Sequence, residues 1–247
     1  MGEHGKHRSL VRAWLVAIVL LSGTSAAANC RQALALGLDV SGSVDAQEYI
    51  LQREGVARAL TSDAVSAVLL RQPDAPVKVT VFEWSGPDHQ VIVQPWIDVT
   101  DATLPDIAAR LQSAGRINGS PTTAIGAAMV FGAGLLAQQA DCWKRTLDIS
   151  GDGPANTGMR PQDVVLGQTA DGIVINGLVI GSGDQSGGDE RQAEIKELSS
   201  YYDAYVIRGA DAFVETAIGF EAYAEAMERK LLRELQSIAL SALPADQ

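Results

Sequence analysis

The sequence predicts an α/β fold in which helices cover both faces of a doubly wound, mostly parallel six-stranded sheet. Short apolar runs alternate with helical periodicity along the whole chain, which is typical of such sheets. A length of 247 residues suits one domain with a full core. The expected strands are 33–38, 77–84, 90–96, 146–149, 174–180 and 204–207.

The connections between the strands predict their directions. Between the second and third strands lies the turn sequence Ser-Gly-Pro-Asp at 85–88, which is too short for a crossover, so these two strands should pair antiparallel. Helix-length segments separate the other strands, which should be parallel. For a doubly wound sheet we expect the strand order 3-2-1-4-5-6, here with strand 3 antiparallel. The expected helices are 45–60, 104–113, 124–139, 161–169, 190–201 and 212–235.

Two of these helices carry charged residues that we expect on the surface. In helix 45–60, apolar residues at helical spacing predict a buried face, and Gln52 and Arg53 should lie on the opposite side. The last helix has an acidic start and a basic finish that includes Lys230, which suits the helix dipole. We interpret both patterns as ordinary solvated surface.

The first 28 residues have the order of a secretory signal peptide. A basic stretch leads into an apolar run at 13–21, and small residues ending in three alanines follow at 22–28. The alternative is a membrane anchor, but the run is about half of the roughly twenty residues that span a bilayer. We expect cleavage, a periplasmic or secreted protein without stable membrane insertion, a domain at 29–236 and a tail at 237–247.

Charge and composition exclude several classes of function. The formal charge of −11 becomes −13 without residues 1–28, because that segment contains three basic residues and one acidic residue. Such a surface repels phosphate backbones, so nucleic acid is excluded as a partner. His89 is the only histidine outside the signal segment. Because histidine is so scarce, most types of catalytic site are excluded.

The two cysteines are expected to form a disulfide. Cys30 and Cys142 are the only cysteines, and an even count in an exported protein favours a bridge. Each lies just before a strand, and strands one and four are neighbours in the expected order. Their first residues should therefore lie within bridging reach, at the sheet edge opposite the carboxyl ends of the strands.

Oxygen-bearing side chains gather at three loops. Asp39, Ser41 and Ser43 follow the first strand at alternate positions, a pattern that by itself is more typical of helix caps. Two further segments, 119–126 and 148–153, lie beside the fourth strand. In the order 3-2-1-4-5-6, the carboxyl ends of strands one and four border the crevice where ligands collect. We expect all three loops to meet there.

With these loops in place, the sequence resembles the von Willebrand factor A (vWA) superfamily, and within it an exported bacterial family whose function is unassigned. The order Asp39-x-Ser41-x-Ser43, then Thr123, then Asp152 is similar to that superfamily's metal-ion-dependent adhesion site. Further matching stretches are 52–55 (Gln-Arg-Glu-Gly), 83–86 (Glu-Trp-Ser-Gly), 95–96 (Pro-Trp), 123–126 (Thr-Ala-Ile-Gly), 149–153 (Ile-Ser-Gly-Asp-Gly) with Asn156, and 175–178 (Ile-Asn-Gly-Leu).

The resemblance implies a vWA/Rossmann-like fold and a divalent cation, Mg²⁺ first, with Mn²⁺ or Ca²⁺ also suitable. Ser41, Ser43 and Thr123 would offer hydroxyls, and Asp39 and Asp152 would act directly or through water. The spacing Thr-x-x-Gly to Gly126 favours Thr123 over Thr122.

Neutral hydroxyls leave the ion electron-poor, so an acidic residue of a protein partner could take an open position. Asn156, which borders the crevice, would hold a backbone turn or touch that partner.

Enzymatic alternatives are weaker. A serine hydrolase would need His89, which is expected in a turn at the antiparallel edge, and the chain has no Gly-x-Ser-x-Gly elbow. A metal-dependent phosphotransferase or hydrolase using Asp39 is the stronger alternative, but Ser41 stands where a second acid is expected. The shortage of histidine and cysteine ligands excludes zinc chemistry. We therefore expect a binding module and not an enzyme.

Overall fold

The structure, a computed structural model, describes residues 1–2, 30–116, 119–167, 171–181 and 188–241. Its six-stranded sheet has the order β3-β2-β1-β4-β5-β6. β2 and β3 pair antiparallel, and the other neighbouring strands pair parallel. The expected fold class is therefore confirmed. The strands are β1 (Cys30–Asp39), β2 (Val77–Trp84), β3 (Gln90–Asp98), β4 (Cys142–Gly151), β5 (Ile173–Ile180) and β6 (Val214–Ala217).

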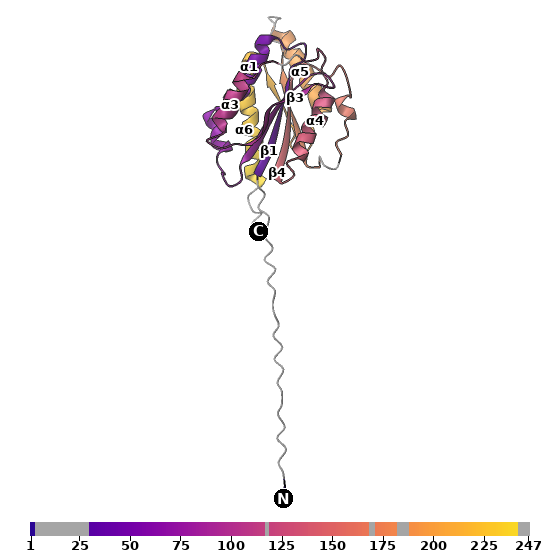
Figure 1. Cartoon of the computed structure of the whole chain (residues 1–247). Helices are drawn as coiled ribbons and strands as arrows, with labels where there is room; N and C mark the ends of the chain where they lie inside the picture. Colours follow the sequence, from indigo (N-terminus) through magenta and orange to yellow (C-terminus); the bar gives the residue numbers. More distant parts are fainter. Residues whose placement is uncertain (3–29, 117–118, 168–170, 182–187, 242–247) are drawn as a thin grey trace.

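Helices cover both faces of this sheet (Figure 1). α1 packs against α3 and α6 on one face, and α4 and α5 cover the other face. In the part of the chain that the structure describes, no helix is both long and apolar enough to cross a membrane. The helices are α1 (Ala46–Thr61), α2 (Asp63–Leu69), α3 (Leu104–Ser113), α4 (Ile125–Ala137), α5 (Gly188–Tyr205) and α6 (Tyr223–Ser241), with short 3₁₀ turns η1 (Pro161–Asp163) and η3 (Phe220–Ala222).

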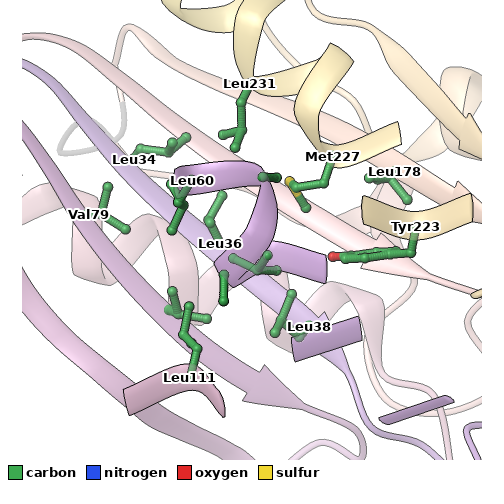
Figure 2. Close-up of a cluster of buried hydrophobic side chains, with 14 of the residues drawn as sticks. Leu34, Leu36, Leu38, Leu60, Val79, Leu111, Leu178, Tyr223, Met227 and Leu231 are labelled. Carbon is green, nitrogen blue, oxygen red and sulfur yellow. The ribbon is translucent and has the colours of Figure 1, made fainter. Parts of the chain in front are cut away.

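β1 lies at the centre of the core and is buried along its whole length. Leu34, Leu36 and Leu38 point to the face covered by α1 and α6, where they join a cluster that includes Met227 and Leu231 (Figure 2). The residues between them belong to the opposite cluster or are small, as expected of a strand buried on both faces. This burial fixes the place where β1 ends, at Asp39.

Two of the expected elements were wrong. Residues 204–207 are not a strand, because α5 continues to Tyr205. Val206, in the turn that follows, still donates its amide to the Tyr202 carbonyl at 2.9 Å, and both residues are fully buried. The sixth strand is instead β6, four residues at the edge of the sheet. Of the expected helix 161–169, the structure describes residues 161–167, and these contain the turn η1 and no α-helix.

The last helix also begins later than expected. β6 and η3 occupy the stretch before Tyr223, and α6 then runs to Ser241, into the stretch expected as a tail. α2 was not expected. Lys230 of α6 is fully buried, so the interpretation of its charge as surface was wrong.

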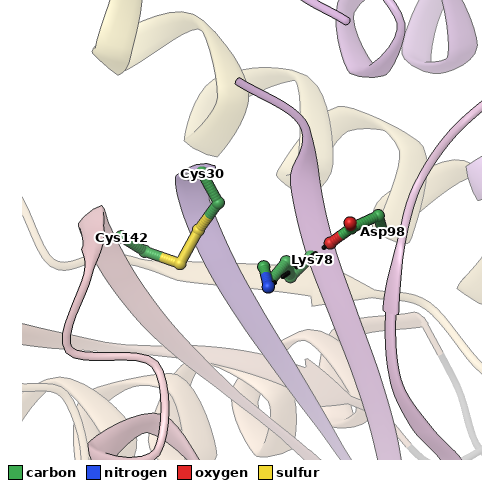
Figure 3. The surroundings of a disulfide bond; sticks show 4 residues. All are labelled: Cys30, Lys78, Asp98 and Cys142. Carbon is green, nitrogen blue, oxygen red and sulfur yellow. Dashed lines mark ion pairs between the residues drawn. A yellow bond between two sulfur atoms is a disulfide. The ribbon is translucent and has the colours of Figure 1, made fainter. Parts of the chain in front are cut away.

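The expected disulfide joins Cys30 and Cys142 (Figure 3). These residues are register partners at the start of the parallel pair β1–β4, with their Cα atoms 4.7 Å apart. Lys78 and Asp98, drawn in the same figure, form an ion pair of 3.5 Å between β2 and β3. The bridge therefore lies at the amino-terminal edge of β1, and the carboxyl end of this strand is left to the candidate site.

Candidate functional site

In the loop after β1, the residue that caps helix α1 is not one of the candidate metal ligands. Asp45 is the N-cap of α1, and its carboxylate accepts hydrogen bonds from the amides of Gln47 (2.7 Å) and Glu48 (2.8 Å). Glu48 accepts in return from the Asp45 amide, which completes a capping box. Because Asp45 caps the helix, Ser41 and Ser43 are not needed for that purpose.

A chain of side-chain hydrogen bonds links the three loops. The Thr123 hydroxyl donates to Ser41 Oγ at 3.3 Å, Ser41 Oγ and Ser43 Oγ lie 3.2 Å apart, and Ser43 donates to Asp152 Oδ1 at 2.8 Å. These four residues come from the loop after β1, the segment before α4 and the end of β4. The structure thus brings the expected hydroxyls and Asp152 together in one place.

Asp39, the last residue of β1, lies beneath this chain and is fully buried. Its Oδ1 accepts from the Ser41 amide at 2.7 Å, and its backbone carbonyl accepts from Gln52 Nε2 at 2.8 Å. Its Oδ2 is buried and has no hydrogen-bond partner among the described residues. A buried carboxylate oxygen without a donor is costly, so this atom fits a cation.

Burial and like charge both act on the two carboxylates. The pKa of Asp39 is raised to about 8, first by burial and then by the charge of Asp152. Burial also raises the pKa of Asp152. A cation between or beside the two groups would reverse this effect by favouring their ionised forms. Without a cation, ionising both carboxylates would oppose the folded state, so Asp39 keeps its proton up to a higher pH than an exposed aspartate.

Asn156 holds Thr123 through the backbone. The side-chain Oδ1 of Asn156 accepts a hydrogen bond from the Thr123 backbone amide at 2.8 Å, and the backbone amide of Asn156 donates to the Thr123 carbonyl at 2.9 Å. Thr122 instead pairs its hydroxyl with Ser120 at 2.8 Å. This geometry places Thr123, and not Thr122, beside the serines, and gives Asn156 a positioning role.

Sequence reasoning missed three supporting residues. Gln52 was expected to face solvent, yet it is fully buried and donates to Asp39; Arg53 is also buried and donates to the carbonyl of Leu111 at 2.6 Å. Gly151 is required where it stands, because a Cβ there would lie 3.2 Å from Asp39 Oδ2 and would collide with the Tyr202 hydroxyl. The available signal was that all three lie in stretches that match the family, Gln52 and Arg53 in 52–55 and Gly151 in 149–153.

The donor set determines which metals suit the site. It consists of two carboxylates and three neutral hydroxyls, which fit a hard divalent cation. Within the described ranges there is no cluster of three or more His, Cys, Asp or Glu side chains that could hold a metal.

The strand order of this sheet is that of the von Willebrand factor A fold. The chain belongs to the family described as "Protein of unknown function (DUF1194)", whose profile matches residues 29–239. No curated protein matches the chain significantly.

Several solved structures share the fold. Proximal thread matrix protein 1 from the mussel byssus was solved with zinc in its metal-ion-dependent adhesion site (MIDAS) motif. It aligns with a TM-score of 0.55 and 18% identity over 85% of this chain and 48% of its own. This chain thus spans about half of that protein. The conserved hypothetical protein BatB from Bacteroides thetaiotaomicron aligns with a TM-score of 0.52 and 15% identity, over 84% of this chain and 98% of its own. The pilus adhesin SpaC from Lactobacillus rhamnosus GG aligns with a TM-score of 0.53 and 16% identity, over 85% of this chain and 30% of its own.

Proposed function

We propose that this protein is an exported binding module in which Asp39, Ser41, Ser43, Thr123 and Asp152 hold a divalent cation, Mg²⁺ before Mn²⁺ or Ca²⁺. The ion's open position receives an acidic residue of a protein partner. The continuous hydrogen-bond chain from Thr123 to Asp152 carries this proposal, together with the buried Oδ2 of Asp39 beneath it, which accepts no hydrogen bond from the residues that the structure describes. The zinc-occupied MIDAS of the mussel matrix protein and the adhesin fold support it.

Each residue has a separate task in this mechanism. The hydroxyls contribute oxygens without adding charge, so a bound ion stays attractive to an external carboxylate. Asp152 holds the Ser43 hydroxyl, and Asp39 holds the Ser41 amide, so each carboxylate also orients a neighbour. Asn156 holds the backbone of Thr123 on both sides. The site is therefore organised by contacts that exist before any partner arrives, which lowers the cost of binding.

Catalysis is not part of the proposal. A serine hydrolase would need an imidazole bound to a serine hydroxyl, and His89 Nε2 has no hydrogen-bond partner among the described residues. Asp39 has its Oδ1 engaged by a backbone amide and lies beneath the hydroxyl chain, fully buried. A nucleophile needs access to substrate, so this burial disfavours the phosphotransferase alternative.

Metal binding should depend on Asp39. Titration calorimetry of the wild type with Mg²⁺, Mn²⁺ and Ca²⁺ should give one site, and Asp39→Ala should abolish it. Because an ion that binds only the folded state stabilises it, a concentration of 100 times Kd should add about 2.7 kcal/mol to the free energy of unfolding of the wild type alone. A chelator should remove this gain.

Asp74→Ala is the matched control for that experiment. Asp74 is exposed and lies between α2 and β2, at the opposite end of the sheet from the site. This variant should bind the ion as the wild type does. Equal metal affinity in Asp39→Ala, or no ion bound by the wild type, would show that the site assignment is wrong.

Export should leave a mature chain that begins near the disulfide. Residues 3–29 lie outside the described part, so cleavage rests on the sequence pattern together with a bridge typical of oxidising compartments. Mass spectrometry of the protein from the extracytoplasmic fraction should find the N-terminus between Ala27 and Cys30. A full-length chain recovered from the membrane would contradict this prediction.

A further inference from the structure

A fully buried tyrosine of α5 has a hydroxyl that packing alone does not explain. Tyr202 belongs to the hydrophobic cluster on the face of the sheet that α4 and α5 cover. Its side chain is completely buried, and its hydroxyl has no hydrogen-bond partner among the described residues. An unpaired hydroxyl in the core costs free energy, and a phenylalanine would fill the same space without that cost.

Two glycines on neighbouring strands leave room for this ring. A Cβ at Gly177 of β5 would lie 2.8 Å from Tyr202 Cδ1, and a Cβ at Gly151 of β4 would lie 2.4 Å from the Tyr202 hydroxyl oxygen. Both distances are too short for a real side chain, so larger residues at these positions would displace the ring. The ring therefore extends from β5 across to the end of β4, and its hydroxyl is directed towards β1, the next strand of the sheet.

The Tyr202 hydroxyl and a carboxylate oxygen of Asp39 border the same small space. The Cβ position at Gly151 that is 2.4 Å from the Tyr202 hydroxyl is also 3.2 Å from Asp39 Oδ2. Trp84, the register partner of Asp39 on β2, adds an apolar wall, because its Cζ2 is 3.5 Å from that position. Asp39 Oδ2, like the hydroxyl, has no hydrogen-bond partner among the described residues. A buried donor and a buried acceptor that both lack a partner therefore lie close together.

We propose that Tyr202 is a positioning residue of the cation site: when the ion is bound, its hydroxyl donates a hydrogen bond to Asp39 Oδ2, directly or through one water. This inference rests on the proposed function and adds a residue of α5, a helix that supplies none of the candidate ligands. Each carboxylate oxygen has two acceptor positions, so Oδ2 can face the ion and accept from Tyr202 at the same time.

The charge of Asp39 determines when this hydrogen bond matters. A bound cation favours the ionised carboxylate, and an ionised carboxylate gains more from a donor than a protonated one does. The Tyr202 hydroxyl is a suitable donor because it keeps its proton: burial and then the charge of Asp39 raise the pKa of Tyr202. Residues that hold a metal ligand from outside the ligand set orient it and strengthen metal binding. Tyr202 should therefore affect metal affinity more than it affects the stability of the metal-free protein.

Tyr202→Phe tests this inference, because it removes the hydroxyl and keeps the ring. Titration calorimetry with Mg²⁺ and Mn²⁺ should give a Kd about 10- to 100-fold higher than that of the wild type, the range expected when a partner of a metal ligand is removed. Urea unfolding in chelator should give at least the stability of the wild type, since the hydroxyl has no partner to lose among the described residues. A role in packing alone would have the opposite result, with lower stability in chelator and an unchanged Kd.

Tyr223→Phe is the matched control. Tyr223 is also fully buried, but it lies on the opposite face of the sheet, where its hydroxyl is 3.0 Å from Ser150 Oγ. This variant should be less stable in chelator and should bind the ion as the wild type does. A wild-type Kd in Tyr202→Phe, or an equal loss of affinity in Tyr223→Phe, would overturn the inference and leave the cation site intact. If the wild type binds no ion, the proposed function is itself wrong.

Discussion

Replacing Lys230 with methionine should destabilise the protein by about 3 to 5 kcal/mol, because it removes a buried ammonium that forms ion pairs with two buried carboxylates. Lys230 lies on α6 and is fully buried. Its ammonium forms ion pairs with Asp148 of β4 and with Glu234, the latter at 2.5 Å. Asn176 of β5 donates to the same Glu234 oxygen at 2.6 Å. The cluster therefore fixes α6 to two central strands through charges that water cannot reach.

Urea unfolding followed by circular dichroism measures this effect. Lys196→Met, at an exposed position of α5, is the matched control and should change the free energy of unfolding by less than about 0.5 kcal/mol. A triple variant, Lys230→Met with Asp148→Leu and Glu234→Gln, should recover part of the loss, because removing all the charges also removes their desolvation cost. If Lys230→Met unfolds at the same urea concentration as the wild type, the buried cluster does not hold α6 in place.

Removing the disulfide should have a comparable effect. The double variant Cys30→Ala, Cys142→Ala opens a loop between residues 112 positions apart, for which the chain-entropy argument gives a loss of about 4 to 5 kcal/mol. The native contacts of β1 and β4 remain, since the two strands are paired along their length. The loss should therefore come mainly from the greater freedom of the unfolded chain.

Reductant supplies the control for this prediction. Under reducing conditions the wild type should unfold at the urea concentration of the double variant, and the variant should be insensitive to reductant. Peptide mapping without reduction should recover Cys30 and Cys142 in one linked species. Two alkylatable thiols in the native exported protein would show that the bridge does not form in the cell.

Patterns that depend on chain connectivity were predictable from the sequence. The short turn after β2 predicts the antiparallel pair, and helix-length segments elsewhere predict parallel strands. The sheet order 3-2-1-4-5-6 comes from the doubly wound fold class that this alternation indicates, and the structure has it. The disulfide follows from that order, because it brings the starts of β1 and β4 together. The three loops of the candidate site are also brought together by this order, since each lies beside β1 or β4. Binding of an ion there stays a prediction.

The missed features share a different cause, which is that a polar residue type does not reveal its own burial. Gln52 and Lys230 have side chains usually found at the surface, and both are fully buried because each has a specific partner. β6 was missed because an edge strand of four residues with a polar composition has too few positions to show alternation. These features depend on tertiary contacts, which local patterns in the sequence do not contain.

The position of the disulfide has a mechanical consequence. β1 runs from the bridge at Cys30 to Asp39 at the candidate site, and it lies between β2 and β4. A partner that pulls on the site while the chain is held at the start of β1 would stretch this strand along its own axis. Its hydrogen bonds to both neighbours would then be loaded in shear together, and the covalent link would prevent β1 from peeling away from β4 one bond at a time.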